Sequence, residues 1–169
     1  RDPKVVAVGE CGLDYLRLKT ESEKPRQAEI FERQIQLARE LNKPLVIHCR
    51  QAYDELAARL AVHPGARGVI HFFSGSWSAA KKFLDLGFYL SFSGVITFAA
   101  DYDETVKNAP SEMILAETDC PFAAPHPFRG QRNEPLYVRA VMERIADLRG
   151  QAAASLAEQL WLNAQKLFF

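Results

Sequence analysis

Short apolar runs alternate along this 169-residue chain with longer segments in which apolar residues recur at helical spacing. Ser78 and Asn133 are the expected N-terminal caps of two helices. The short runs predict buried strands at residues 4–9, 44–50, 67–73, 88–94 and 112–119. The helical spacing predicts helices near residues 26–41, 51–62, 78–86, 101–109, 133–148 and 151–167. Apolar strands joined through helices are typical of a parallel sheet with βαβ crossovers, so we predict an α/β fold whose strand C-termini share one edge.

Four of the five predicted strands end on a side chain that can bind a metal ion. Glu10 follows the first strand, His48 and His71 end the second and third, and Asp119 ends the fifth. Because parallel strands bring their C-termini to one edge, these four residues are expected to converge there. Two imidazoles and two carboxylates suit Zn²⁺, Mn²⁺ or Mg²⁺. Each residue taken alone also has a structural explanation: a histidine buried in the core, a Glu10–Arg50 pair, or an aspartate in a turn.

A cysteine directly follows three of these candidate ligands: Cys11, Cys49 and Cys120. Because side chains alternate between the two faces of a strand, Cys11 and Cys49 are expected to face the helices as small core residues. The alternative, a zinc site made of the three cysteines, requires this alternation to fail at every strand. The cysteines are too few for a disulfide framework and suit a reducing compartment, so we expect a cytoplasmic protein.

Composition and charge indicate little about partners. The 21 Lys and Arg residues balance 21 Asp and Glu residues, so no overall charge attracts the chain to nucleic acid or to a membrane. A nucleic-acid substrate therefore requires a local basic patch. No apolar run approaches the roughly 18 residues of a membrane span, and we expect no membrane partner.

Six segments, in this order, resemble motifs of the TatD family of metal-dependent deoxyribonucleases: GECGLDY, VIHCR, IHFFSG, YLSFSG, LAETDCPF and RGQRNEP. The resemblance extends over essentially the whole chain, as a single domain of residues 1–169. It implies a (β/α)₈ barrel of the TIM type and a divalent metal centre, usually with two ions. It also implies hydrolysis of phosphodiester bonds in DNA, as single strands or ends, by metal-activated water.

The resemblance further implies a role for each candidate ligand. Glu10 would bridge the two metal ions, which would be Mg²⁺, Mn²⁺ or Zn²⁺. His48 and His71 would hold one ion. Asp119 would hold the other ion and act as the general base, so that Asp119 and Glu10 are the expected catalytic residues.

Other residues of these motifs are candidates for binding phosphate. Ser74 and Gly75 precede a predicted helix, where glycine allows backbone N–H groups to approach a phosphate. Arg50, Arg129 and Arg132 carry guanidinium groups that match phosphate oxygens. Arg129 and Arg132 are equally well explained as solvated loop residues.

The chain departs from the family pattern in two respects. Many members carry a His-x-His pair on the first strand, and this sequence has none. The pattern also supplies about five βα units where such a barrel has eight. We therefore expect an incomplete barrel, the C-terminal part of a TatD-like (β/α)₈ fold, whose open edge a missing N-terminal segment or a partner covers.

Two alternatives to a deoxyribonuclease remain open. One is a metallohydrolase of the same superfamily that acts on another ester, an amide or another phosphate, since a fold does not determine a function. The other is an inactive fragment that lacks the His-x-His ligands.

Overall fold

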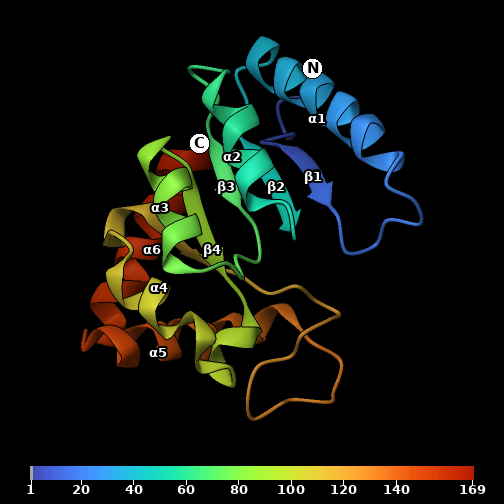
Figure 1. The fold of residues 1–169 in the computed structure, drawn as a ribbon. Helices are drawn as coiled ribbons and strands as arrows, with labels where there is room; N and C mark the ends of the chain where they lie inside the picture. The colour runs from blue at the N-terminus through green and yellow to red at the C-terminus, as the bar shows by residue number, and fades with distance from the viewer. Residues whose placement is uncertain (1) are drawn as a thin grey trace.

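The structure is a computed structural model that describes residues 2–169. In this part of the chain, five parallel strands form one sheet. Each strand pairs with the next one along the chain, so the order across the sheet is β1-β2-β3-β4-β5 (Figure 1). The strands are β1 (Val8–Asp14), β2 (Leu45–Arg50), β3 (Gly68–Ile70), β4 (Tyr89–Phe92) and β5 (Ile114–Ala116). The predicted parallel α/β fold is confirmed.

Helices connect the strands and follow the last one (Figure 1). They are α1 (Glu23–Glu40), α2 (Tyr53–Ala61), α3 (Trp77–Asp85), α4 (Asp103–Asn108), α5 (Val138–Arg149) and α6 (Ala153–Phe168). Short 3₁₀ helices lie at η1 (Gly94–Thr97), η2 (Ala100–Tyr102), η3 (Ser111–Met113) and η4 (Pro135–Tyr137). Among the helices of residues 2–169, none is long and apolar enough to cross a membrane.

Strand side chains alternate between two buried clusters, one on each face of the sheet. One set packs against helical residues such as Phe31 and Phe83, and its strand members are Ile47, Ile70, Leu90 and Ile114. The other set packs against α6 and comprises Val46, Val69, Tyr89 and Leu115. His48 and His71 lie two residues beyond Val46 and Val69, so the period of two directs both imidazoles to this second face.

The first strand differs from its predicted position at residues 4–9. It begins at Val8 and continues through Glu10 to Asp14, because the pairing with β2 gains an extra residue between Val8 and Cys11. A bulge of this kind redirects a side chain without ending the strand. The prediction that the strand ends on Glu10 is therefore wrong: Glu10 lies inside the strand, at its bulge.

The other four strands are shorter than predicted. β2 lacks only the first predicted residue, whereas β3, β4 and β5 end early because the residues after them leave the sheet. His71 lies directly after β3, and its N–H still donates to the carbonyl of Ile47 at 2.8 Å. Beyond β5, the N–H of Glu117 donates to the carbonyl of Phe92 at 3.0 Å. These bonds fix the backbone at the positions that carry polar side chains.

Both predicted helix caps are wrong. The side chain of Ser76, rather than that of Ser78, accepts from the N–H of Ala79 at the start of α3. The chain after Asn133 forms the 3₁₀ turn η4 before α5 begins. The buried Asn133 side chain instead donates to the carbonyl of Phe122 at 2.6 Å, so it holds the preceding loop.

Asn163 ties α6 to the start of β5 and gives a test of this packing. Its side-chain amide is buried and donates to the carbonyls of Ser111 and Ile114, both at 2.8 Å. Asn163→Ala leaves these acceptors without their partner and is expected to lower the free energy of unfolding by about 1–3 kcal/mol, measured by urea denaturation. Leu162→Ala, at the exposed neighbouring position, should change it by only about 0.5 kcal/mol. Equal effects of the two substitutions would contradict this account.

Candidate metal centre

Four predicted ligands meet at the carboxyl edge of the sheet. Glu10, His48, His71 and Asp119 all line one cavity of about 440 Å³. They come from the bulge of β1, from β2, and from the segments that directly follow β3 and β5. The structure therefore brings together residues that are more than a hundred positions apart in the sequence.

The His48 imidazole lies between two carboxylates. Its Nε2 atom is 3.1 Å from Oδ2 of Asp14, and its Nδ1 atom is 3.1 Å from Oε1 of Glu10. Asp14 is itself held in place, because its Oδ1 atom accepts from the N–H groups of Leu16 and Arg17. One ring nitrogen of His48 is thus anchored, and the other is directed at Glu10.

The His71 imidazole has the same kind of surroundings. Its Nδ1 atom lies 2.8 Å from Oε1 of Glu117, which also accepts from the N–H of Phe72 at 2.8 Å. Its Nε2 atom lies 3.8 Å from Oε1 of Glu10 and 3.7 Å from Oδ1 of Asp119. Both imidazoles therefore direct one nitrogen at the same oxygen of Glu10.

Asp14 and Glu117 are functional candidates whose contacts with the two histidines sequence reasoning did not predict. Carboxylates that bind the outer nitrogen of a ligating histidine fix its orientation and its tautomer. The position of Glu117 could have been predicted from the sequence, because it lies two residues before Asp119 and its side chain is therefore expected on the same face of the sheet. The contact of Asp14 with His48 gave no comparable signal, because it depends on the register between β1 and β2.

The carboxylates around the cavity shift the protonation of two members of the cluster. Burial lowers the pKa of His71, but its hydrogen bond to Glu117 and the charges of Glu117, Glu10 and Asp119 outweigh this effect and raise it above its ordinary value. Burial raises the pKa of Asp119; His71 opposes this rise, and Glu117 and Glu10 add to it. Both shifts indicate an excess of negative charge that positive charge would relieve.

The donor chemistry fits a divalent cation, but the side chains are paired with one another. Among residues 2–169, no group of three or more His, Cys, Asp or Glu side chains surrounds a common point at which an ion could lie. Ligand bonds of about 2.1 Å at tetrahedral angles place neighbouring donor atoms about 3.4 Å apart. The 3.1 Å distance between His48 and Glu10 is slightly shorter than this spacing. The distances from His71 to Asp119 and to Glu10, 3.7 and 3.8 Å, are slightly longer.

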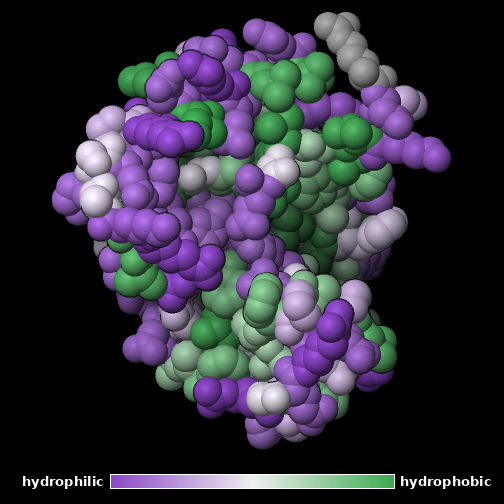
Figure 2. Space-filling view, turned by 90° about the vertical axis from the view of Figure 1, so that its right-hand side faces the viewer, coloured by the Kyte–Doolittle hydropathy of each residue, from purple (hydrophilic) through white to green (hydrophobic). Residues whose placement is uncertain are grey.

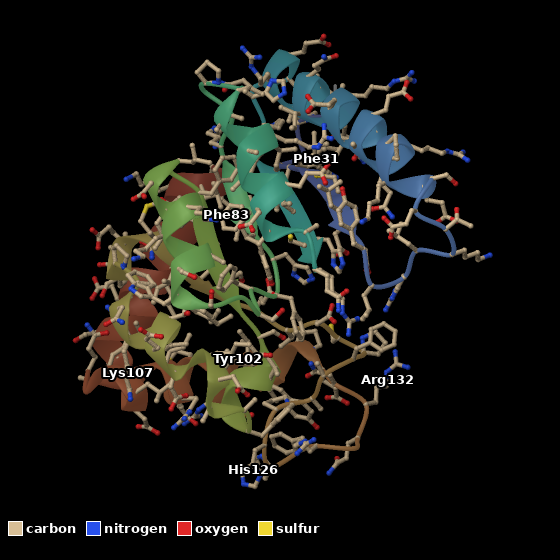
Figure 3. All side chains as sticks on the ribbon, in the orientation of Figure 1. Phe31, Phe83, Tyr102, Lys107, His126 and Arg132 are labelled. Carbon is tan, nitrogen blue, oxygen red and sulfur yellow. The ribbon has the colours of Figure 1, made fainter. Side chains whose placement is uncertain are left out.

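The phosphate-binding candidates are divided between two regions. Arg50 and Ser74 line the cavity, together with Arg17, which sequence reasoning missed. Arg129 does not line it; its guanidinium lies 4.0 Å from the centre of the Phe98 ring. Arg132, labelled in Figure 3, lies on the long loop before η4 and is also outside the lining.

Gly75 packs closely against aromatic rings. A Cβ atom at this position would lie 2.8 Å from the ring of Phe73 and 3.2 Å from the ring of Tyr53. This close approach explains the glycine without a ligand. The adjacent Ser74 is held by Tyr53, whose hydroxyl accepts from its N–H at 3.3 Å.

The cysteines do not form a site. Cys11 and Cys49 belong to the core that includes the helices, as predicted, whereas Cys120 is exposed. The alternative of a zinc site made of three cysteines is therefore wrong. Burial raises the pKa of both core thiols to about 12, with a further contribution from Glu10 at Cys11.

Comparison with known proteins shows similarity along the whole chain. The family model described as TatD related DNase matches residues 1–169. The metal-dependent hydrolase YabD of Bacillus subtilis, named as uncharacterized, is 46% identical and is matched over 98% of this chain and 66% of its own length. The 3'-5' ssDNA/RNA exonuclease TatD of Klebsiella pneumoniae is 36% identical, over 99% of this chain and 66% of its own length.

A solved structure shows the same relation. The crystal structure of YjjV, a TatD homologue from Escherichia coli, superimposes with a TM-score of 0.90 at 34% identity, over 98% of this chain and 64% of that one. The chain thus spans about two thirds of the length of the proteins that it matches. Five βα units make up a similar share of a TIM barrel, which has eight.

The carboxylates behind the two histidines should contribute to metal affinity. Asp14→Asn and Glu117→Gln remove the charge that orients each imidazole, and each is expected to weaken Mn²⁺ binding about 10- to 100-fold in a calorimetric titration. Glu158→Gln, at an exposed position on α6, is the control and should leave the affinity unchanged. Unchanged affinity in both site variants would show that these contacts do not orient the ligands.

The burial of the cysteines predicts selective alkylation. Iodoacetamide at mildly alkaline pH should modify Cys120 in the folded chain, because it is the exposed thiol. Cys11 and Cys49 should react only after unfolding in guanidinium chloride, since their buried thiols do not ionise at that pH. Peptide mass spectrometry before and after unfolding tests this, and native labelling of either buried thiol would contradict it.

Proposed function

Because the chain belongs to the TatD-related DNase family of metal-dependent hydrolases, we propose that it hydrolyses phosphodiester bonds in DNA with the help of divalent cations. One observation carries the proposal: a ring nitrogen of each of two histidines is directed at one oxygen of Glu10, in a cavity that Asp119 also lines. Imidazole and carboxylate groups are the ligands that Mg²⁺, Mn²⁺ and Zn²⁺ take in hydrolases.

In this proposal the four cavity residues hold two ions. His48 and His71 would hold one ion, Asp119 would hold the other, and Glu10 would be a ligand shared by both. Bound divalent cations polarise phosphoryl oxygens and lower the pKa of bound water, which suits phosphodiester hydrolysis. Asp119 would be the general base; its place in the cavity and the resemblance to the family support this role.

Positive and polar groups around the ligands would hold the substrate. Arg17 and Arg50 line the cavity and supply guanidinium groups for the phosphate at the reacting bond. Ser74 would add a hydroxyl and Gly75 a backbone N–H group at the start of the segment that leads into α3. Arg129 and Arg132 lie on the part of the loop that does not line the cavity, and they would contact phosphates further along the DNA strand.

The proposed substrate is a single strand or a DNA end. The relative from Klebsiella pneumoniae is named a single-stranded DNA and RNA exonuclease, which supports this choice and makes RNA a second polymer to test. YabD carries only the general name of a metal-dependent hydrolase. That name supports a second candidate function, hydrolysis of another ester, an amide or another phosphate.

We also propose that the free side of β1 is covered in the working protein, by a further segment or by a partner. Within residues 2–169, β1 pairs with β2 alone and therefore forms an edge of the sheet. Figure 2 shows hydrophobic side chains in a hollow on the side of the molecule that carries β1 and α1. An edge strand beside an apolar hollow is a surface that proteins normally cover.

Activity on a single-stranded oligonucleotide tests the proposed function. A chelator should abolish cleavage and added Mg²⁺ or Mn²⁺ should restore it, because the ligands alone supply no Lewis acid. Asp119→Asn should lower the rate at least about 100-fold, since it removes both a ligand and the base, whereas Glu158→Gln should not. Product length on a denaturing gel is the measurement.

Three outcomes would contradict the proposal. Cleavage that persists in the chelator would exclude the metal. Metal-dependent hydrolysis of a phosphomonoester, carboxyl ester or amide, without cleavage of the oligonucleotide, would favour the second candidate function. A chain that binds the cation and cleaves none of these substrates would be the inactive fragment that the missing His-x-His pair predicts.

A further inference from the structure

The loop between β5 and η4 presents an aromatic ring beside the candidate ligands. Phe122 lies three residues after Asp119 and lines the same cavity as Glu10 and the two histidines. Its exposed fraction is 68%, which is large for phenylalanine. Figure 3 shows this loop at the lower right, below the strand ends, with His126 and Arg132 labelled along its outer part.

The backbone of Phe122 is held on both sides, although its ring is exposed. Its N–H donates to the carbonyl of Asp119 at 2.7 Å, which ties its backbone to the backbone of the candidate ligand. Its carbonyl accepts from the side-chain amide of Asn133 at 2.6 Å. Asn133 is 2% exposed, and its own N–H donates to the carbonyl of Pro121 at 3.1 Å. The backbone that carries the ring is therefore held by hydrogen bonds, one of them from the buried Asn133 amide.

The rest of the loop is packed against η1. A Cβ atom at Gly94 would lie 2.3 Å from the carbonyl oxygen of Ala123, so the two backbones are in close contact. Further along, the N–H of His126 donates to the hydroxyl of Thr97 at 2.8 Å. The loop thus holds an apolar ring in solvent on a constrained backbone.

The remaining cavity wall is suited to a nucleotide. Phe72 and Tyr102 add two aromatic side chains, and Arg17 and Arg50 add two guanidinium groups, beside the candidate metal ligands. Sites for single-stranded nucleic acid combine these two features, because bases stack on aromatic rings while the phosphates contact cations. A volume of about 440 Å³ lies within the range of small-molecule sites and can take one nucleotide.

We propose that the Phe122 ring is a stacking platform for one unpaired base, next to the phosphodiester that the metal centre hydrolyses. This inference rests on the proposed function and adds the feature of the substrate that is recognised. The face of a base inside a duplex is covered by its neighbours, whereas an unpaired terminal base can leave the stack. Phe122 therefore favours single-stranded over double-stranded substrate.

Fluorescence of a terminal 2-aminopurine tests the platform without cleavage. The probe is a short single-stranded oligonucleotide with phosphorothioate linkages, titrated with the whole chain in the presence of Mn²⁺. Stacking on Phe122 should quench the fluorescence, and Phe122→Ala should remove the quenching and weaken binding roughly 5- to 100-fold. Phe122→Tyr should retain both, because it keeps an aromatic face.

Three controls separate stacking from other effects of the substitution. Phe122→Leu keeps an apolar side chain and should behave like Phe122→Ala. Trp161→Ala removes another exposed aromatic side chain, 64% exposed on α6 and outside the cavity, and should change nothing. An oligonucleotide with a terminal abasic site should bind the wild type and Phe122→Ala equally. Circular dichroism and the thermal midpoint should show that every variant is folded.

The proposal is overturned if Phe122→Ala binds and quenches like the wild type, if Phe122→Leu retains quenching, or if the wild type binds no oligonucleotide. The proposed function can fail separately. Quenching that depends on Phe122, without metal-dependent cleavage of a normal oligonucleotide, would support the platform and refute the nuclease. Cleavage with the same KM and kcat in wild type and Phe122→Ala would support the nuclease and refute the platform.

Discussion

The Glu10 carboxylate lies between two imidazoles because β1 contains one extra residue relative to β2. Without that bulge, every later residue of β1 would face the opposite side of the sheet. The bulge allows Cys11 and Leu13 to remain in the core while Glu10 lies in the cavity. The geometry of the candidate metal centre depends on this local irregularity.

A concentration of carboxylates around two histidines is electrostatically costly unless each is held by other groups. The backbone N–H groups of Leu16 and Arg17 hold Asp14, and the N–H of Phe72 holds Glu117. These bonds fix the positions of both carboxylates in the folded chain. The remaining negative charge is directed at the interior of the cavity, where a divalent cation would be stabilised. The same arrangement keeps each imidazole in one orientation, with its inner nitrogen facing Glu10.

The two faces of the sheet have separate roles. One face packs against α1, α2, α3 and α5, and it includes the thiols of Cys11 and Cys49. The other face carries an apolar layer near the start of the strands and the polar cluster at their carboxyl ends. The loop after β5 adds to this edge, where the buried Asn133 amide holds Phe122 near the ligands. The candidate site is thus confined to the carboxyl end of one face, whereas apolar packing occupies the other face and the start of the same strands.

The amino-acid sequence by itself determined the element order, the parallel sheet, the burial of Cys11 and Cys49, and the convergence of Glu10, His48, His71 and Asp119 at one edge. Apolar runs and the alternation of side chains along a strand are local properties of the sequence. In a parallel sheet they determine which face each strand residue occupies and at which edge each strand ends. Only the tertiary structure decided that Asp14 and Glu117 contact the histidines, that Arg17 rather than Arg129 lines the cavity, and that Asn133 holds a loop instead of capping a helix. These outcomes depend on the register between strands and on how loops pack after the strands have paired, and no short stretch of sequence contains that information.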